Sequence, residues 1–138
     1  MTDHPMDILG LDHVVLRCTD LQAMLDFYQN VLGCRLERTL ADLGLYQLRA
    51  GSALIDLVPV GSELGGKTPP EPTGFNMAHL CLRIELPDWQ TIRDHLEAHG
   101  VAWEAPRRRY GADGYGLSVY LSDPGGNTVE LKGPPETT

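Results

Sequence analysis

The sequence predicts an α+β fold in which two βαβββ modules form a curved mixed sheet around a cleft. The first reason is a repeat: the pattern His-x-x-Leu-Arg occurs at His13–Arg17 and again at His79–Arg83. The second is that each copy is followed by a helical pattern and then by strand-like stretches. The third is that each half ends on a carboxylate inside an apolar run, Asp56 in the first and Glu130 in the second. Neither half has enough apolar surface to fold alone, so the two are expected to share a core.

The first module begins with a strand and a helix. Side chains of Leu11–Cys18 alternate between an apolar face and a polar one, and the polar face is expected to line the cleft. The helix that follows has Thr19 or Asp20 as its cap, with Gln22 completing a capping-box pattern after Thr19. Gly33 ends the helix, because glycine tolerates the left-handed conformation found there. Three strand-like stretches complete the module: Cys34–Leu40, Leu43–Ala50 and Ser52–Pro59.

The second module repeats this order. Met77–Glu85 is a predicted strand, and a helix follows that opens at Asp88 and ends at Gly100. The predicted strands after it are Val101–Pro106, Gly116–Ser122 and Thr128–Lys132. The basic run Arg107–Arg109 and the glycine-rich stretch Arg109–Gly114 are expected to form a solvated surface loop, with a mobile lid as the alternative.

The chain is therefore expected to form one domain over residues 1–138. Its first module covers about residues 9–60 and its second about residues 77–132. Residues 61–76 are rich in glycine and proline, so they form a linker between the halves or a loop over a site.

Two histidines and two carboxylates, one of each per module, are the candidate functional residues: His13, Asp56, His79 and Glu130. A carboxylate in the middle of a strand is costly to bury unless it is paired or binds a cation. Imidazole and carboxylate ligands suit Zn, Ni, Mn, Co or Fe. The alternative is that the histidines are hydrogen-bonded core residues and the acids lie on a hydrated sheet face. The matched repetition of both residue types favours a metal-binding cleft.

Composition excludes several classes of partner. The net charge of −8 argues against nucleic acid, whose phosphates require a basic stripe. No apolar run approaches the ~20 residues that a membrane-spanning helix needs, and the N-terminus lacks the pattern of a secretory signal. The three cysteines, Cys18, Cys34 and Cys81, form no Cys-x-x-Cys pair, so a cytoplasmic protein without a disulfide framework is expected. The expected partner is a small-molecule substrate.

Several motifs together resemble one known family. They are Leu11–Leu16, Asp26–Tyr28 with Val31–Gly33, Ala78–Leu80 and Asp123–Leu131. With these motifs the chain resembles the vicinal oxygen chelate superfamily, which includes glyoxalases, bleomycin-resistance proteins and extradiol dioxygenases. The resemblance spans about residues 9–132 and implies the glyoxalase/bleomycin resistance/dihydroxybiphenyl dioxygenase fold. In that family, two vicinal oxygens of the substrate chelate a divalent metal.

The resemblance implies specific ligands. The first-strand histidines of both modules and the last-strand carboxylate bind the metal in the family, which corresponds to His13, His79 and Glu130. Asp56 stands where glyoxalase I has a fourth ligand, a glutamate. One divalent metal per site is therefore expected. Glu130 is the expected base that removes a proton next to a carbonyl, with Asp56 as the second choice.

The resemblance also suggests residues that bind substrate. Arg17 matches an arginine that contacts the glutathione carboxylate in glyoxalase I, and it shares the face of His13. Arg83 is its counterpart in the repeat. The alternative is that both are solvated arginines at strand ends.

The implied function is a divalent-metal-dependent glyoxalase-like lyase or isomerase acting on a small oxygenated metabolite or thiol adduct. One alternative is a fosfomycin-resistance-type metalloenzyme that opens an epoxide. Another is a metal-free drug-sequestering protein of the bleomycin-resistance kind, which the candidate ligands argue against. Extradiol dioxygenases are disfavoured because their chains are commonly twice this length. Single-chain relatives often build each site across two subunits, so a homodimer with metal sites at or near the subunit interface is expected.

Overall fold

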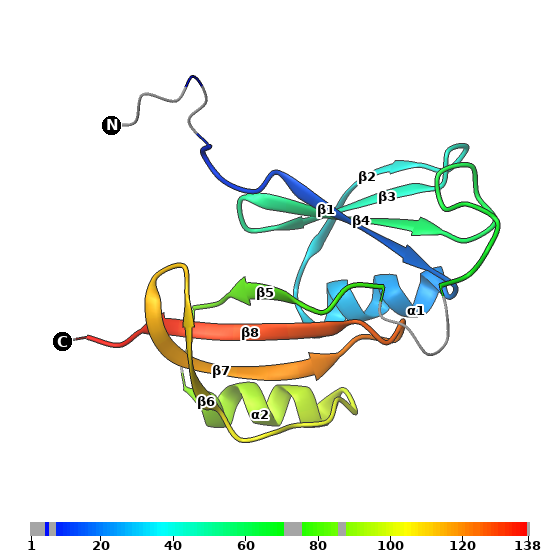
Figure 1. Cartoon of the computed structure of the whole chain (residues 1–138). Coiled ribbons are helices and arrows are strands. Elements are labelled where there is room, and N and C mark those ends of the chain that lie inside the picture. The colour runs from blue at the N-terminus through cyan, green and yellow to red at the C-terminus, as the bar shows by residue number, and fades with distance from the viewer. Residues whose placement is uncertain (1–4, 6–7, 71–75, 86–87, 138) are drawn as a thin grey trace.

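The computed structural model describes residues 5, 8–70, 76–85 and 88–137, and its strands form two separate sheets (Figure 1). In chain order the elements are β1 (His13–Cys18), α1 (Leu21–Asp26), η1 (Phe27–Val31), β2 (Arg35–Leu40), β3 (Leu45–Ala50), β4 (Ala53–Pro59), β5 (Leu80–Arg83), α2 (Trp89–Ala98), β6 (Arg107–Gly111), β7 (Gly114–Ser122) and β8 (Thr128–Pro135). This order confirms the α+β fold with two βαβββ modules.

The two sheets have the same topology. The first has the order β1-β4-β3-β2 and the second β5-β8-β7-β6. In each, the first strand of the module runs parallel to the last, and the remaining pairs are antiparallel. Each sheet is therefore mixed, and β1 and β5 are edge strands. Within the described residues β1 and β5 are not hydrogen-bonded to each other, so each module has a sheet of its own.

The first helix begins as an α-helix and continues as a π-helix. Its cap is Asp20, whose side chain accepts from the backbone N–H of Ala23. Gln22 instead donates to Asp26, so the capping box expected after Thr19 does not form. After α1 the helix continues as the π-helical η1 and ends before Gly33, whose φ of +78° is the expected left-handed stop.

One hydrophobic core joins the modules. In Figure 1, α1 lies between the first sheet and the β7–β8 end of the second, while α2 lies along the other side of the second sheet. The core cluster takes side chains from both sheets and from both helices: Leu16, Cys18, Met24, Leu25, Tyr28, Leu48, Ile55, Leu57, Leu96, Val119, Leu121, Val129 and Leu131. This sharing agrees with the expectation that neither half buries enough apolar surface by itself.

A buried hydrogen bond fixes the two modules to each other. The hydroxyl of Tyr28 in η1 donates to Oδ2 of Asp123 at 2.7 Å. Asp123 opens the β7–β8 turn, where its carboxylate also accepts from the backbone N–H of Gly125 and Asn127 and from the Asn127 side chain. The Asp123–Asn127 turn therefore links the second sheet to the first helix as well as joining its own strands.

The segment after α2 differs from the prediction. Val101–Pro106 forms no strand, and the strand is Arg107–Gly111, which pairs with β7 as a hairpin. The runs expected to form a surface loop, Arg107–Arg109 and Arg109–Gly114, therefore lie in the hairpin of β6 and β7 and in the short turn between these strands. A Cβ on Gly111 would lie 3.0 Å from Cε of Lys132, and one on Gly116 would lie 2.8 Å from a backbone oxygen. These glycines allow close packing inside the sheet, a role that composition does not distinguish from a turn.

The linker folds back on the first module. The backbone N–H of Gly65 donates a hydrogen bond to the Ser62 hydroxyl, which in turn donates to the backbone oxygen of Pro59 at the end of β4. Gly65 also packs closely against Pro59. Residues 71–75 of the predicted 61–76 linker lie outside the described residues.

No helix in the described part of the chain is both long and apolar enough to cross a membrane. Cys18, Cys34 and Cys81 are all free thiols.

Replacing Tyr28 by phenylalanine tests the contact between the modules. We expect Tyr28→Phe to lower the free energy of unfolding by about 1.5–3 kcal/mol, because a buried carboxylate loses a donor. Burial and the charge of Asp123 raise the pKa of Tyr28. The stabilisation is therefore full below about pH 10 and is lost as the pH rises, since only the unfolded chain then releases the phenol proton.

The measurement is urea unfolding at neutral pH and near pH 11. The control is Tyr110→Phe, which changes an exposed side chain and should leave stability within about 0.5 kcal/mol of the original. Equal effects of the two substitutions at neutral pH would contradict a structural role for the Tyr28–Asp123 bond.

Candidate metal centre

The first pair of predicted ligands lies on one face of the first sheet, where β1 runs parallel to β4. The register places Val15 opposite Asp56, so His13, two residues earlier, shares the face of Asp56. Nε2 of His13 lies 3.9 Å from Oδ2 of Asp56. Asp56 is only 3% exposed, whereas the His13 ring is partly open to solvent. The predicted parity of both residues is confirmed.

Asp56 has an incomplete set of partners. Its neighbour on β3 is Gln47, whose amide nitrogen donates to both carboxylate oxygens at 3.3 Å. Within the described residues, its ion-pair contact is with His13, and no lysine or arginine reaches it. A buried carboxylate without a full positive charge beside it costs free energy. The donor set around Asp56 therefore fits a position that gains a cation.

The second pair repeats this arrangement on the second sheet. His79 lies immediately before β5, and Glu130 lies on β8 opposite Cys81. Nε2 of His79 is 3.2 Å from Oε1 of Glu130, which is 6% exposed. The edge of the Tyr120 ring packs against His79, with ring centroids 5.5 Å apart. Burial, followed by the charge of Glu130, raises the pKa of the Cys81 thiol to about 11.

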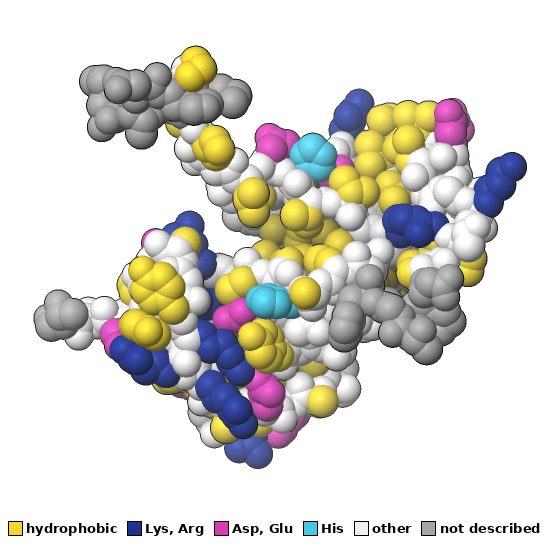
Figure 2. Space-filling view, viewed as in Figure 1, with side chains coloured by type: hydrophobic (Ala, Val, Ile, Leu, Met, Phe, Trp, Pro, Cys, Tyr) yellow, Lys and Arg dark blue, Asp and Glu magenta, His cyan; other side chains and the backbone are white. Residues whose placement is uncertain are grey.

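The two pairs remain apart in one chain. Figure 2 shows a histidine on each side of the hollow between the two sheets, each with an acidic side chain next to it and apolar surface between them. Across the described residues, no three His, Cys, Asp or Glu side chains gather closely enough to hold a metal ion. The structure thus brings the four predicted ligands together in twos. Each pair supplies one imidazole and one carboxylate.

The two predicted substrate-binding arginines have partners within the chain. Nε of Arg17 donates to the backbone oxygen of Gly65 at 2.9 Å, and its Nη2 donates to that of Thr68. Arg17 therefore holds the segment after β4 against β1. Arg83 forms a 2.6 Å ion pair with Asp113, in the β6–β7 turn. Their contact with a substrate stays a prediction.

Two residues that the sequence does not mark as functional lie near the pairs: Asp12 contacts His13, and Arg109 contacts the Tyr120 ring that packs against His79. Oδ2 of Asp12 lies 2.7 Å from Nδ1 of His13, and this hydrogen bond raises the pKa of His13. Arg109 places its guanidinium 4.1 Å above the Tyr120 ring and donates to Ser118. Asp12 is signalled by its position next to a candidate ligand. The sequence predicts a solvated loop for Arg109, and only the pairing of β6 with β7 brings this residue to the face of Tyr120.

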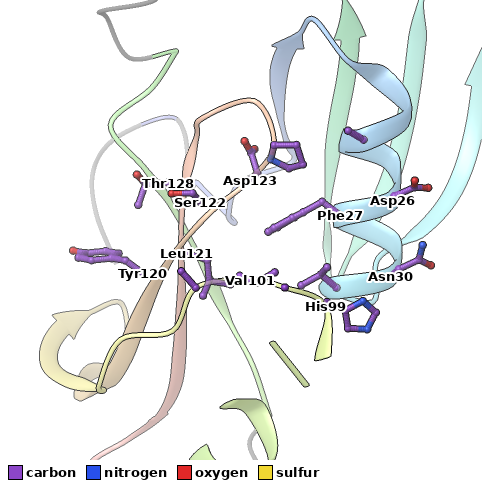
Figure 3. A pocket seen from close by; sticks show the side chains of 15 residues that line it. Asp26, Phe27, Asn30, His99, Val101, Tyr120, Leu121, Ser122, Asp123 and Thr128 are labelled. Atoms are coloured by element: carbon purple, nitrogen blue, oxygen red, sulfur yellow. The ribbon is translucent and has the colours of Figure 1, made fainter. Parts of the chain in front are cut away.

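A groove lies elsewhere, away from both histidine–carboxylate pairs. It encloses about 860 Å³ between α1–η1 and the β7–β8 end of the second sheet, and none of the four predicted ligands lines it. In Figure 3, Phe27 projects toward the middle of this groove, while Asp26, Asn30 and His99 lie at its edge. The groove is therefore distinct from both histidine–carboxylate pairs.

Known proteins resemble this chain along most of its length. The model of the Glyoxalase/Bleomycin resistance protein/Dioxygenase superfamily matches residues 10–131. The glyoxalase domain-containing protein RDO1 of Mycosarcoma maydis is 32% identical over 129 residues, covering 91% of this chain and 69% of that protein.

Solved structures share the fold. An integron cassette protein from the mobile metagenome of V. cholerae has a TM-score of 0.72 and 30% identity, covering 94% of this chain and 98% of the other. The fosfomycin resistance protein FosX of Listeria monocytogenes has a TM-score of 0.68 and 23% identity, covering 91% of each chain, and shows likeness of fold alone. From the extent of the family match and the identity to RDO1, this chain belongs to the Glyoxalase/Bleomycin resistance protein/Dioxygenase superfamily.

Proposed function

We propose that this chain is a divalent-metal-dependent, glyoxalase-like lyase or isomerase that acts on a small oxygenated metabolite or thiol adduct. The observation that carries the proposal is the pair of buried carboxylates, each next to a histidine and, within the described residues, without a lysine or arginine ion pair. Membership of the superfamily supports it. The free cysteines fit a reducing compartment, and we place the protein in the cytoplasm as part of the proposal.

The proposed ligands are His13, Asp56, His79 and Glu130. Their imidazole nitrogens and carboxylate oxygens suit one divalent Zn, Ni, Mn, Co or Fe ion per site. When bound, the ion would act as a Lewis acid that stabilises negative charge developing on a substrate oxygen. The burial of Asp56 and Glu130 keeps water from competing for their oxygens.

We further propose that each site is shared between two copies of the chain in a homodimer. Two protein ligands from one pair are fewer than the three or four that such metals usually take. His13 and Asp56 of one chain would meet His79 and Glu130 of the other. Exposed apolar side chains on β1 and on the segment before it support this arrangement, because Leu9, Leu11 and Val15 are 99%, 81% and 52% exposed. A second copy would cover such side chains.

The proposed base is Glu130. A desolvated carboxylate within reach of the proton next to a carbonyl is what general base catalysis requires, and Asp56 is the second candidate. Arg17 and Arg83 are proposed to meet an anionic part of the substrate. To do so, they would exchange their present partners, the backbone oxygen of Gly65 and the carboxylate of Asp113.

A second candidate is a fosfomycin-resistance-type enzyme that opens an epoxide. It would use the same ligands, and the fold shared with FosX keeps it open. A metal-free drug-sequestering protein is less well supported, because it gives no reason for two buried carboxylates that each lie next to a histidine.

Metal binding tests the proposal. We expect the wild-type dimer to hold two metal ions, and His13→Ala or His79→Ala alone to abolish tight binding because each removes a ligand from both sites. His99→Ala is the control, since His99 belongs to neither pair. Metal content after gel filtration is the measurement. Unchanged stoichiometry in His79→Ala would exclude the site.

Mixed dimers test whether the sites are shared. Co-expression of His13→Ala and His79→Ala chains with different tags yields dimers in which one shared site keeps all four ligands and the other loses both histidines. We therefore expect one metal ion per tandem-purified dimer. A mixed dimer without metal would contradict sites between subunits while leaving metal binding itself to the single-variant result.

An activity screen tests the reaction. The metal-loaded protein is assayed with methylglyoxal–thiol adducts, fosfomycin with a thiol or water, and catechols. We expect turnover of the thiol adducts, and a fall in kcat of about 10²–10⁴-fold in Glu130→Gln at equal metal occupancy. Glu97→Gln on α2 is the control. Turnover of fosfomycin alone would support the second candidate instead.

A further inference from the structure

The two repeated histidines differ in the residue that precedes them. Asp12 comes before His13, whereas Ala78 comes before His79. Oδ2 of Asp12 lies 2.7 Å from Nδ1 of His13, within hydrogen-bonding distance. Ala78 has no polar side chain, so His79 receives nothing equivalent from its neighbour. The duplication is therefore asymmetric at the position next to each candidate ligand.

The backbone fixes where Asp12 lies. Its carbonyl oxygen accepts from the N–H of Leu54 at 3.0 Å, which extends the β1–β4 pairing to the residue before β1. The pairing that places His13 beside Asp56 thus also fixes the backbone of Asp12, from which its carboxylate reaches the His13 ring. Side chains of Asp12 and His13 are 90% and 44% exposed, so the contact adds little to the stability of the fold.

The hydrogen bond has a consequence for the imidazole. An ionised carboxylate only accepts, so the proton of a neutral His13 ring is placed on Nδ1. Nε2 is then left with its lone pair, on the side of the ring that lies 3.9 Å from Asp56. His79 differs, because the side-chain contact that the structure gives its ring is at Nε2, which lies 3.2 Å from a carboxylate oxygen of Glu130.

We propose that Asp12 is a positioning residue that holds His13 in the Nδ1–H tautomer, with Nε2 directed to the cation that His13 and Asp56 bind. This inference rests on the proposed metal-binding function and deepens it. Carboxylates that orient metal-binding histidines in this way typically change metal affinity about 10–100-fold when removed. The first module is then organised for the cation in advance, whereas His79 gives up its contact with Glu130 when the site assembles.

The experiment compares Asp12→Ala and Asp12→Asn with the wild-type protein and with Asp94→Ala, which removes an exposed carboxylate on α2. Long-range proton–nitrogen NMR of the metal-free protein reads the tautomer of His13, assigned with His13→Ala, at a pH where the ring is neutral. Affinity for Zn²⁺ is measured by competition with a chelator. We expect Asp12→Ala to lose the Nδ1–H preference and to bind Zn²⁺ about tenfold or more weakly.

Asp12→Asn provides the rescue, because its amide oxygen still accepts a hydrogen bond. It should keep the tautomer and lie between wild type and Asp12→Ala in affinity, while Asp94→Ala changes neither reading. Wild-type protein that binds no Zn²⁺ would refute the proposed function, and with it this role. Tight binding by wild type with the same tautomer and affinity in Asp12→Ala would refute the role of Asp12 alone.

Discussion

Parallel pairing between the first and last strands of each module is the constraint on which both histidine–carboxylate pairs depend. The register sets Val15 against Asp56 in one sheet and Cys81 against Glu130 in the other. Because paired residues project to the same face, each histidine two residues earlier in its strand sequence falls beside the carboxylate. A shift of one residue in either pairing would turn the carboxylate into the apolar core.

The cost of these carboxylates is offset by the rest of the fold. Asp56 and Glu130 are almost fully buried, yet each is met by amide or imidazole groups and, among the described residues, by no ion pair with lysine or arginine. A shared hydrophobic core and the Tyr28–Asp123 hydrogen bond hold the modules together in spite of this. Buried carboxylates without a matching cation are typical of functional sites, where the fold loses some stability and the site gains groups that can bind a ligand.

Local patterns predicted the elements where one signal dominated. Alternation in the strand of His13, the stop at Gly33 and the turn at Asp123–Asn127 all agree with the structure. The prediction failed at Val101–Pro106 and at the glycine-rich hairpin of β6 and β7. There, Gly111 and Gly116 leave room for the Lys132 side chain and for a neighbouring backbone oxygen. A single sequence does not distinguish glycines in such close contacts from glycines in a turn.

The sequence by itself determined the duplicated modules, the superfamily that its motifs resemble, and the identity of two histidines and two carboxylates as candidate ligands, because repeats, motifs and alternation are read directly along the chain. Only the tertiary structure decided that these four residues meet in twos, that Gln47 contacts Asp56, and that Arg17 binds the chain's own backbone. The reason is that register and packing between distant strands decide which side chains touch. Those long-range contacts depend on the whole core and leave no local signal along the sequence.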